Sequence, residues 1–419
     1  MEAVDRADQA GNNVEAERVL SRAIELAPGH PGVLNAAGMR ALGRGDLGRA
    51  LSFLQAAAKL DPRDPLLRVN VALTQRKLGN EAAERDALEQ ALEIDPRYFP
   101  ALLHKARLLE RQGKIGAASY TYNMFLSSLP AGEHPPAVQE AVVHAHKVIR
   151  ENFNELEKFL EPRLHVARER HSSERLERFD ACLEMILGKR QIYRPEPTFM
   201  LYPQIPAIEF PDRSHYPWLS EFDAATDEIR AEALSVLSDA GDDFVPYISR
   251  PAGAPVDQWL ELNNSKRWST YFLMKNGKSI DSHLARCPRT AALLRAAPLC
   301  QIPDHAPTAF FSVLAPRTTI PPHTGVTNTR FIVHLPLVVP PDCMYRVGAE
   351  KRPWREGNAW VFDDTFEHEA VNNSDLPRIV LIFDVWNCFL TDAERDLVAV
   401  VTAGVNDFNH GESPFRQGG

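Results

Sequence analysis

The sequence is informative first for what it lacks. It has no basic excess: its 419 residues carry a formal net charge of -9 at pH 7, which leaves no footprint for a nucleic-acid backbone. No apolar run approaches the roughly 18 residues that a membrane-spanning helix needs. The opening segment, MEAVDRADQAGNNVEAERVL, has neither the basic start nor the apolar core of a secretory signal. We therefore expect no nucleic-acid partner and no membrane span.

Cysteine is scarce and never closely spaced. The five cysteines form no CxxC pair, which argues against a zinc site and against a disulfide framework. This usage is typical of a reducing compartment, so we expect a cytoplasmic protein. The content of 44% hydrophobic and 25% charged residues is that of an ordinary globular protein, and the length allows two or three domains.

What the sequence does contain is a repeat, because glycine and proline each recur every 34 residues over four copies. The recurring residues are Gly11, Gly45, Gly79 and Gly113, and Pro28, Pro62, Pro96 and Pro130. A glycine that is free to take positive φ ends the first helix of each copy, and a proline stops the second. Thirty-four residues is the period of the tetratricopeptide helix-turn-helix unit. Residues 1–130 resemble such repeats, and we expect an all-α solenoid there.

A solenoid of this kind has a concave face that usually holds a peptide or a protein. We therefore expect a peptide or protein, either substrate or partner, in the groove of the repeats. A second interpretation stays open, in which the repeats only support or dimerise the next domain. Residues 131–193 continue as charged helix, and we expect them to form a helical bridge or cap.

A proline-rich stretch at 194–217 marks the entry to a second domain, residues 194–419. After one more helix, at about 219–239, the hydrophobic period changes to two. The segments with this period are TAFFSVLAP, RFIVHLPLVVP, NAWVFDD and PRIVLIFDVW. Short antiparallel strands that follow helices predict an α+β domain whose core is a double-sheet jelly roll, the double-stranded β-helix, or a barrel.

Two histidines in this domain stand at strand ends. His323 follows two prolines in PPHTG, and His368 lies in FDDTFEHEAV. Histidines from two strands are the usual start of a non-haem iron site, whose third ligand is a carboxylate two residues after the first histidine. Here that position is Gly325, so from the motif alone a metal site and an ordinary pair of histidines both stay open. We interpret Asp363 and Asp364 as turn-capping residues.

A longer match bears on these alternatives. The stretches FFSVLAPRTTIPPHTGVTNTRFIVHLPLVVP and WREGNAWVFDDTFEHEAVNNSDLPRIVLIFDVW resemble the catalytic domain of aspartyl/asparaginyl β-hydroxylases. The resemblance covers about residues 260–400 and is strongest over 312–386. It includes the HTG motif itself, because that family lacks the carboxylate ligand. The resemblance implies a dioxygenase that depends on Fe(II), 2-oxoglutarate and O2.

The resemblance also implies a role for each of five residues. It makes His323 and His368 the two iron ligands. Arg378 would hold the distal carboxylate of 2-oxoglutarate, with Ser312 assisting, and His334 would contact this cosubstrate near the metal. These roles suit the side chains, since a guanidinium matches a carboxylate in a bidentate fork and a hydroxyl adds a donor. Taken singly, Arg378, His334 and Ser312 are equally typical of ordinary strand or core residues.

One position departs from the family, which has an arginine where this chain has Ile332. Arg330 lies on the same face of the strand by period two and is a possible substrate contact. Lys266 and Arg267, upstream in LNNSKRWSTYFLMKNGKSIDSH, are candidate contacts to an acidic substrate. Because the family arginine is missing, the substrate is not fixed by the resemblance.

The function that the resemblance implies is hydroxylation of the β-carbon of an Asp or Asn residue in a peptide or protein, which the repeats could present to the iron. Three alternatives stay open. The substrate could be a carrier-bound amino acid or a lipid acyl chain. A chloride in the position left open beside Gly325 would turn hydroxylation into halogenation. The chain could also be a non-catalytic tetratricopeptide scaffold.

Overall fold

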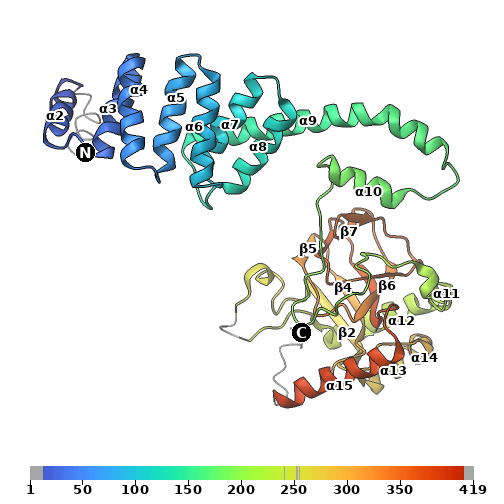
Figure 1. The fold of residues 1–419 in the computed structure, drawn as a ribbon. Helices are drawn as coiled ribbons and strands as arrows, with labels where there is room; N and C mark the ends of the chain where they lie inside the picture. Colours follow the sequence, from blue (N-terminus) through green and yellow to red (C-terminus); the bar gives the residue numbers. More distant parts are fainter. Residues whose placement is uncertain (1–12, 240, 252, 254, 410–419) are drawn as a thin grey trace. The chain divides into compact units, whose positions relative to one another are not determined.

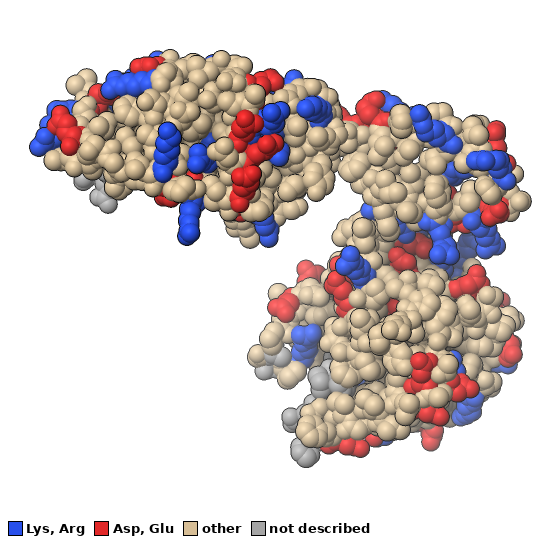
Figure 2. Space-filling view, viewed as in Figure 1, with Lys and Arg blue, Asp and Glu red and all other residues tan. Residues whose placement is uncertain are grey.

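The computed structural model describes residues 13–239, 241–251, 253 and 255–409, and it divides into two compact units, residues 1–189 and 190–419 (Figure 1). No helix among the described residues is both long enough and apolar enough to span a lipid bilayer. On the face shown in Figure 2, basic and acidic side chains lie intermixed on both units. The finer boundaries expected from the sequence, at 130 and 193, stay predictions.

The first unit is built of helices that pair in antiparallel fashion. They are α2 (Asn13–Leu26), α3 (Pro31–Arg44), α4 (Leu47–Leu60), α5 (Pro65–Lys77), α6 (Glu81–Ile94), α7 (Phe99–Arg111), α8 (Ile115–Ser128), α9 (Pro136–Glu169) and α10 (Glu177–Ile186). Gly45, Gly79 and Gly113 each separate two paired helices with φ between 71° and 81°, a conformation that glycine adopts without strain. Gly11 lies outside the described residues. The predicted helical repeat region is confirmed.

Small residues let the paired helices approach closely. Ala57 and Ala91, which occupy the same phase of successive repeats, are fully buried. Gly38 in α3 lies so near α4 that an added Cβ would stand 2.5 Å from Cγ of Leu54. The long helix α9 continues the packing through Ala141 and Ala145, which are buried in one apolar cluster with side chains of α7 and α8. The repeats therefore depend on close backbone contact at these crossings.

The second unit contains two antiparallel sheets. The larger has the strand order β1 (Val245–Pro246), β2 (Trp268–Lys275), β4 (Ala309–Leu314), β11 (Arg378–Trp386), β6 (Arg330–Val338) and β9 (Trp360–Phe362), with β3 (Lys278–Ser279) paired to β2. The smaller has the order β5 (Thr318–His323), β10 (His368–Asn372), β7 (Cys343–Val347) and β8 (Glu350–Arg352). All four segments expected from the period of two form strands of the larger sheet. The antiparallel α+β domain is confirmed, but both sheets are open, so the jelly-roll closure stays a prediction.

Helices complete the second unit. The single helix expected at 219–239 is broken at Ala225 into α11 (Leu219–Ala224) and α12 (Thr226–Asp239). The other α-helices are α13 (Asp281–Arg286), α14 (Pro288–Ala296) and α15 (Asp392–Phe408). Phe222 of α11 and Ile229 of α12 belong to the same buried cluster.

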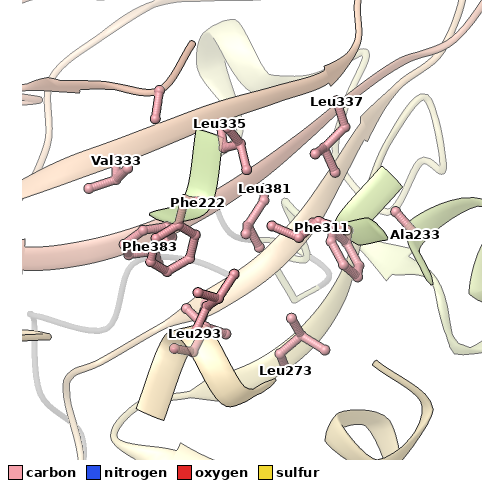
Figure 3. Close-up of a cluster of buried hydrophobic side chains, with 14 of the residues drawn as sticks. Phe222, Ala233, Leu273, Leu293, Phe311, Val333, Leu335, Leu337, Leu381 and Phe383 are labelled. Atoms are coloured by element: carbon pink, nitrogen blue, oxygen red, sulfur yellow. The ribbon is translucent and has the colours of Figure 1, made fainter. Parts of the chain in front are cut away.

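The larger sheet has a core face and a second face of different character. On β6, Val333 and Leu335 pack with Leu381 and Phe383 of β11 and with side chains from α11, α12 and α14 (Figure 3). Because side chains alternate along a strand, the residues between them, such as His334, point to the other face. That other face lines a cavity.

The close contact at Gly38 can be tested by substitution. Gly38→Ala would push a methyl group into Leu54, and we expect the free energy of unfolding to fall by about 1–3 kcal/mol. Gly43→Ala in the same helix is the matched control, because nothing lies within 4 Å of its added Cβ. That control should stabilise the helix by up to about 1 kcal/mol. Unfolding followed by circular dichroism at 222 nm measures both, and equal effects would contradict the packing argument.

Candidate active site

The second face of the larger sheet and residues of the smaller sheet line a cavity of about 560 Å3. Its wall includes side chains from β4, β6 and β11 of the larger sheet and from β5 and β10 of the smaller. His323, His368, Arg378, Ser312, His334 and Arg330 all line it. The structure thus gathers into one cavity six residues that the sequence singled out over a span of more than 60 positions.

The two histidines at the strand ends lie side by side. The antiparallel pairing of β5 with β10 sets His323 directly opposite His368, and their ring centroids are 4.0 Å apart. In each ring Nδ1 lies close to the backbone carbonyl two residues earlier, at 2.7 Å from Pro321 O and 3.0 Å from Phe366 O. A carbonyl only accepts, so both Nδ1 atoms carry the proton and both Nε2 atoms keep a free lone pair. This is the tautomer that binds a metal through Nε2.

Burial keeps both imidazoles neutral. It lowers the pKa of His323 to about 4, and burial together with the nearby His323 lowers the pKa of His368 well below its usual value. A neutral ring is the form that coordinates a metal. The part of the chain that the structure describes holds no group of three or more His, Cys, Asp or Glu side chains arranged for a metal ion. The protein therefore offers two imidazole ligands here rather than a complete set.

The position two residues after His323 is filled from elsewhere in the chain. A Cβ on Gly325 would lie 2.2 Å from the Asp364 carboxyl group, and the Gly325 N–H donates to Asp364 O at 2.6 Å. Asp364 is 4% exposed, and its Oδ1 has no hydrogen-bond partner among the described residues. Burial raises the pKa of this carboxyl to about 7. A carboxyl group thus stands where a side chain at Gly325 would be.

Asp364 is a residue that the sequence interpretation missed. Asp363 does cap the turn, since its Oδ1 accepts from the N–H and the hydroxyl of Thr365 at 2.9 and 2.6 Å. Asp364 does not cap the turn and faces the cavity instead. The signal that could have distinguished the two is Gly325, because a residue without a side chain leaves room for a group from another segment. Trp259, whose ring lies 5.0 Å from that of His323, was also missed, and no motif marks it.

The cavity wall also has a group of residues suited to an anion. Arg378 is 1% exposed, and its Nε and Nη1 have no hydrogen-bond partner among the described residues. Burial lowers its pKa to about 10, so the guanidinium is still charged at neutral pH. Ser312 accepts from Trp268 Nε1 at 3.1 Å and keeps its hydroxyl proton to donate. His334 is buried beside them, with Nδ1 also lacking a partner in the described part of the chain.

The three basic residues considered as substrate contacts have other partners. Arg330 lines the cavity but forms a buried ion pair with Asp384. Lys266 and Arg267 do not line it: Lys266 Nζ donates to Gly241 O at 3.2 Å, and Arg267 donates to Arg317 O at 2.7 Å. The structure therefore brings Arg330 to the site in neutralised form and leaves Lys266 and Arg267 away from the cavity wall.

The start of the second unit forms part of the site. We call residues 194–200, RPEPTFM, the entry segment. The Glu196 N–H donates to Thr365 O at 2.8 Å, and the Thr198 N–H donates to Gly325 O at 2.9 Å. The two prolines that alternate with these residues have no N–H to satisfy. The entry segment is thereby bonded to the turn after His323 and to the turn before His368.

The contact between Gly325 and Asp364 gives a first test of this geometry. Gly325→Ala should lower the free energy of unfolding by about 1–3 kcal/mol, because its methyl group needs the space of the Asp364 carboxyl. The double variant Gly325→Ala with Asp364→Ala should recover most of that loss. Chemical denaturation of the four proteins in a double-mutant cycle measures the coupling. Additive effects would show that the two positions do not meet.

The entry segment gives a second test. Thr198→Pro removes one backbone donor and leaves Gly325 O without it, so we expect a loss of about 1–3 kcal/mol in stability. Thr198→Val is the matched control, because it keeps the N–H and nearly the same shape. Thermal unfolding compares the two variants with the parent chain. A Thr198→Pro protein as stable as Thr198→Val would mean that the entry segment does not hold the turn.

Known proteins resemble the region that contains this site. Residues 223–388 match the family described as Aspartyl/Asparaginyl beta-hydroxylase, and residues 67–98 match a tetratricopeptide repeat. Human aspartate beta-hydroxylase domain-containing protein 2 is 36% identical over 142 residues, which are 33% of this chain and 38% of the relative. Human aspartyl/asparaginyl beta-hydroxylase is 32% identical over 168 residues, 40% of this chain and 21% of that protein.

A third relative is named for a lipid rather than for an aspartate or asparagine residue. The ornithine lipid ester-linked acyl 2-hydroxylase of Rhizobium tropici is 32% identical over 181 residues, which are 41% of this chain and 58% of that protein. The chain therefore spans less than two thirds of each of these three relatives. Within the matched region, the chain carries a domain of the aspartyl/asparaginyl β-hydroxylase family, in one polypeptide with tetratricopeptide repeats.

Proposed function

We propose that the second unit is an Fe(II)- and 2-oxoglutarate-dependent dioxygenase that hydroxylates an aliphatic carbon. One observation carries the proposal: two neutral imidazoles with free Nε2 atoms share a cavity with a buried guanidinium that has unpaired N–H groups. Nε2 atoms suit a ferrous ion. An unpaired, buried guanidinium calls for an anion, and a dicarboxylate cosubstrate supplies one.

Five of the lining residues have a role in this proposal. His323 and His368 would hold the iron through Nε2, while Arg378 and the Ser312 hydroxyl would bind the distal carboxylate of 2-oxoglutarate. His334 would contact the same molecule. When bound, the iron and 2-oxoglutarate supply the oxidising power with which O2 hydroxylates an unactivated carbon. The protein would position the reactants in the cavity lined by the two sheets, which we expect to form a double-stranded β-helix.

Asp364 favours hydroxylation over halogenation. Halogenation would require a chloride in the space beside Gly325, and the Asp364 carboxyl occupies that space. An anion there would be disfavoured by volume, and also by charge whenever Asp364 is ionised. The unpartnered Oδ1 of Asp364 can instead accept a hydrogen bond from a neutral donor, such as water, next to the two histidines.

The substrate predicted by the resemblance is an Asp or Asn side chain, hydroxylated at its β-carbon and presented by the repeats as part of a peptide or protein. A second candidate is an aliphatic chain, such as a lipid acyl group or a carrier-bound residue. The second is favoured by the apolar part of the wall, where Phe310, Ile332 and Ile382 line the cavity. For both candidate substrates, binding of a peptide in the groove of the repeats is part of the proposal.

Metal binding tests the enzyme against the non-catalytic scaffold. Anaerobic titration of the protein with ferrous ion and 2-oxoglutarate should produce the visible charge-transfer band of the chelated iron. His323→Ala and His368→Ala should each abolish it, because neither remaining ring can hold the ion alone. His165→Ala, an exposed helix residue of the first unit, is the control and should keep the band. A parent protein without the band would favour the scaffold.

The anion site predicts an unusual pair of effects for Arg378→Met. Without ligand, the variant should be more stable than the parent by about 1–3 kcal/mol, because a buried charge without a partner is removed. With 2-oxoglutarate and Mn2+ at about 100 times the dissociation constant, the parent should gain about 2.7 kcal/mol. The variant should lose most of that gain. Thermal unfolding with and without ligand measures both, and an unchanged ligand effect in Arg378→Met would refute the assignment.

A further inference from the structure

We propose that the substrate of this cavity is basic rather than acidic: an aliphatic chain that ends in an ammonium or guanidinium group. The inference rests on the proposed function for the reaction, but it is carried by the charges of the cavity wall. Three arginines and six carboxylates line the cavity, and most of the positive charge is already engaged.

The arginines leave little for an anionic substrate. Arg378 lies in the anion site and is assigned to the cosubstrate carboxylate. Arg330 is buried against Asp384, whose other oxygen accepts from the Thr308 N–H at 2.8 Å. Arg250 is the remaining arginine of the described wall, and its Nη1 donates to Pro255 O at 2.6 Å. That bond leaves the charge and the other N–H groups of Arg250 in place, so two of the three lining arginines, Arg378 and Arg330, are already committed and Arg250 is the one that a substrate carboxylate could meet.

Carboxylates are in excess among the exposed and half-buried lining residues, which we call the mouth of the cavity. Glu367 and Glu369 share one cation, Arg346, which donates to them at 2.8 and 2.6 Å. Glu196 and Asp257 are exposed, line the cavity, and form no ion pair within the described residues. A cationic group that approaches the cavity is attracted by this excess, and an anionic group is repelled.

An independent observation lies deeper in the cavity. The Oδ1 of Asp364 is buried, lines the cavity and has no donor among the described residues. Asp364 and Asp384 both lie close enough to Arg330 to interact with its charge, so one guanidinium serves two carboxyl groups. A buried acceptor without a donor favours a ligand that brings N–H groups. Asp364 in the interior therefore favours the same kind of ligand as the carboxylates of the mouth, one that brings N–H groups.

The wall between these charges is apolar. Tyr247, Phe310, Ile332 and Ile382 lie on it and belong to one cluster of packed hydrophobic side chains. Lysine, arginine and ornithine combine the two properties that this wall selects, because their methylene stems pack on apolar surface while the charged end reaches a polar one. The reacting carbon would be one of the methylenes, whether the basic group belongs to a peptide, a free amino acid or a lipid headgroup.

Matched probes test the charge preference. Nα-acetyl-lysine amide, Nα-acetyl-norleucine amide and Nα-acetyl-glutamate amide have similar lengths and differ in charge. Dissociation constants are measured from the shift of the charge-transfer band of the anaerobic Fe(II)–2-oxoglutarate complex, and by calorimetry on the metal-free protein. We expect lysine to bind at least tenfold more tightly than glutamate, with norleucine between them, and the ratio to shrink at high salt.

Two variants assign the preference to the mouth. Glu196→Gln combined with Asp257→Asn should reduce the lysine-to-glutamate ratio severalfold. Asparagine is chosen because Asp257 has φ of 38°, which asparagine tolerates. Asp396→Asn makes the same kind of charge change on an exposed residue outside the cavity and should leave the ratio unchanged.

The outcomes separate the two proposals. Equal or tighter binding of the glutamate probe, or no binding of any probe in either measurement, overturns the charge inference and leaves the oxygenase intact if the band is present. Absence of the band overturns the oxygenase, and the calorimetric ranking then still decides the charge preference. A basic probe that binds best should next be compared as a peptide, as a free amino acid and as a lipid headgroup in neutral vesicles.

Discussion

The pairing of β5 with β10 is the constraint on which the site depends. Because side chains alternate along a strand, a slip of one residue in this register would turn one imidazole away from the other. The register is fixed by burial: Ile320 and Ala370, which are paired across the two strands, belong to the same apolar cluster between the sheets. Continued regularly, that pairing would set His368 opposite Pro322, and the irregularity between His368 and Ala370 shifts the partner to His323. The two imidazoles need no bond to each other to be placed.

Buried polar groups without hydrogen-bond partners indicate what the rest of the cavity binds. Each buried donor or acceptor left unpaired costs stability, and the guanidinium of Arg378 and the carboxyl of Asp364 are among the most enclosed polar groups of the second unit. Both line one cavity, and an apolar core would not retain either. Their presence is understandable if each is satisfied by a bound molecule, an anion at Arg378 and a donor at Asp364.

The sequence predicted the structural features that depend on a regular residue spacing or on a motif. The 34-residue spacing predicted the helical repeats, and the period of two predicted β4, β6, β9 and β11. It could not tell which of Asp363 and Asp364 caps the turn and which faces the cavity, because only the fold decides the direction of each side chain. It could not show that Arg330 is neutralised, because Asp384 is 54 residues away in the chain. Lys266 and Arg267 looked suitable as cations near a strand, but their side chains bond elsewhere.

The entry segment shows that the functional unit is larger than the region that matches the family. The match begins at residue 223, yet Glu196 and Thr198 are bonded to the turns that carry the two histidines, and both line the cavity. The compact unit begins at residue 190, which includes them. A strand-like segment with alternating prolines offers its N–H groups at every second residue, as a one-sided contact requires. The chain that leaves the repeats therefore becomes part of the cavity wall as soon as it enters the second unit.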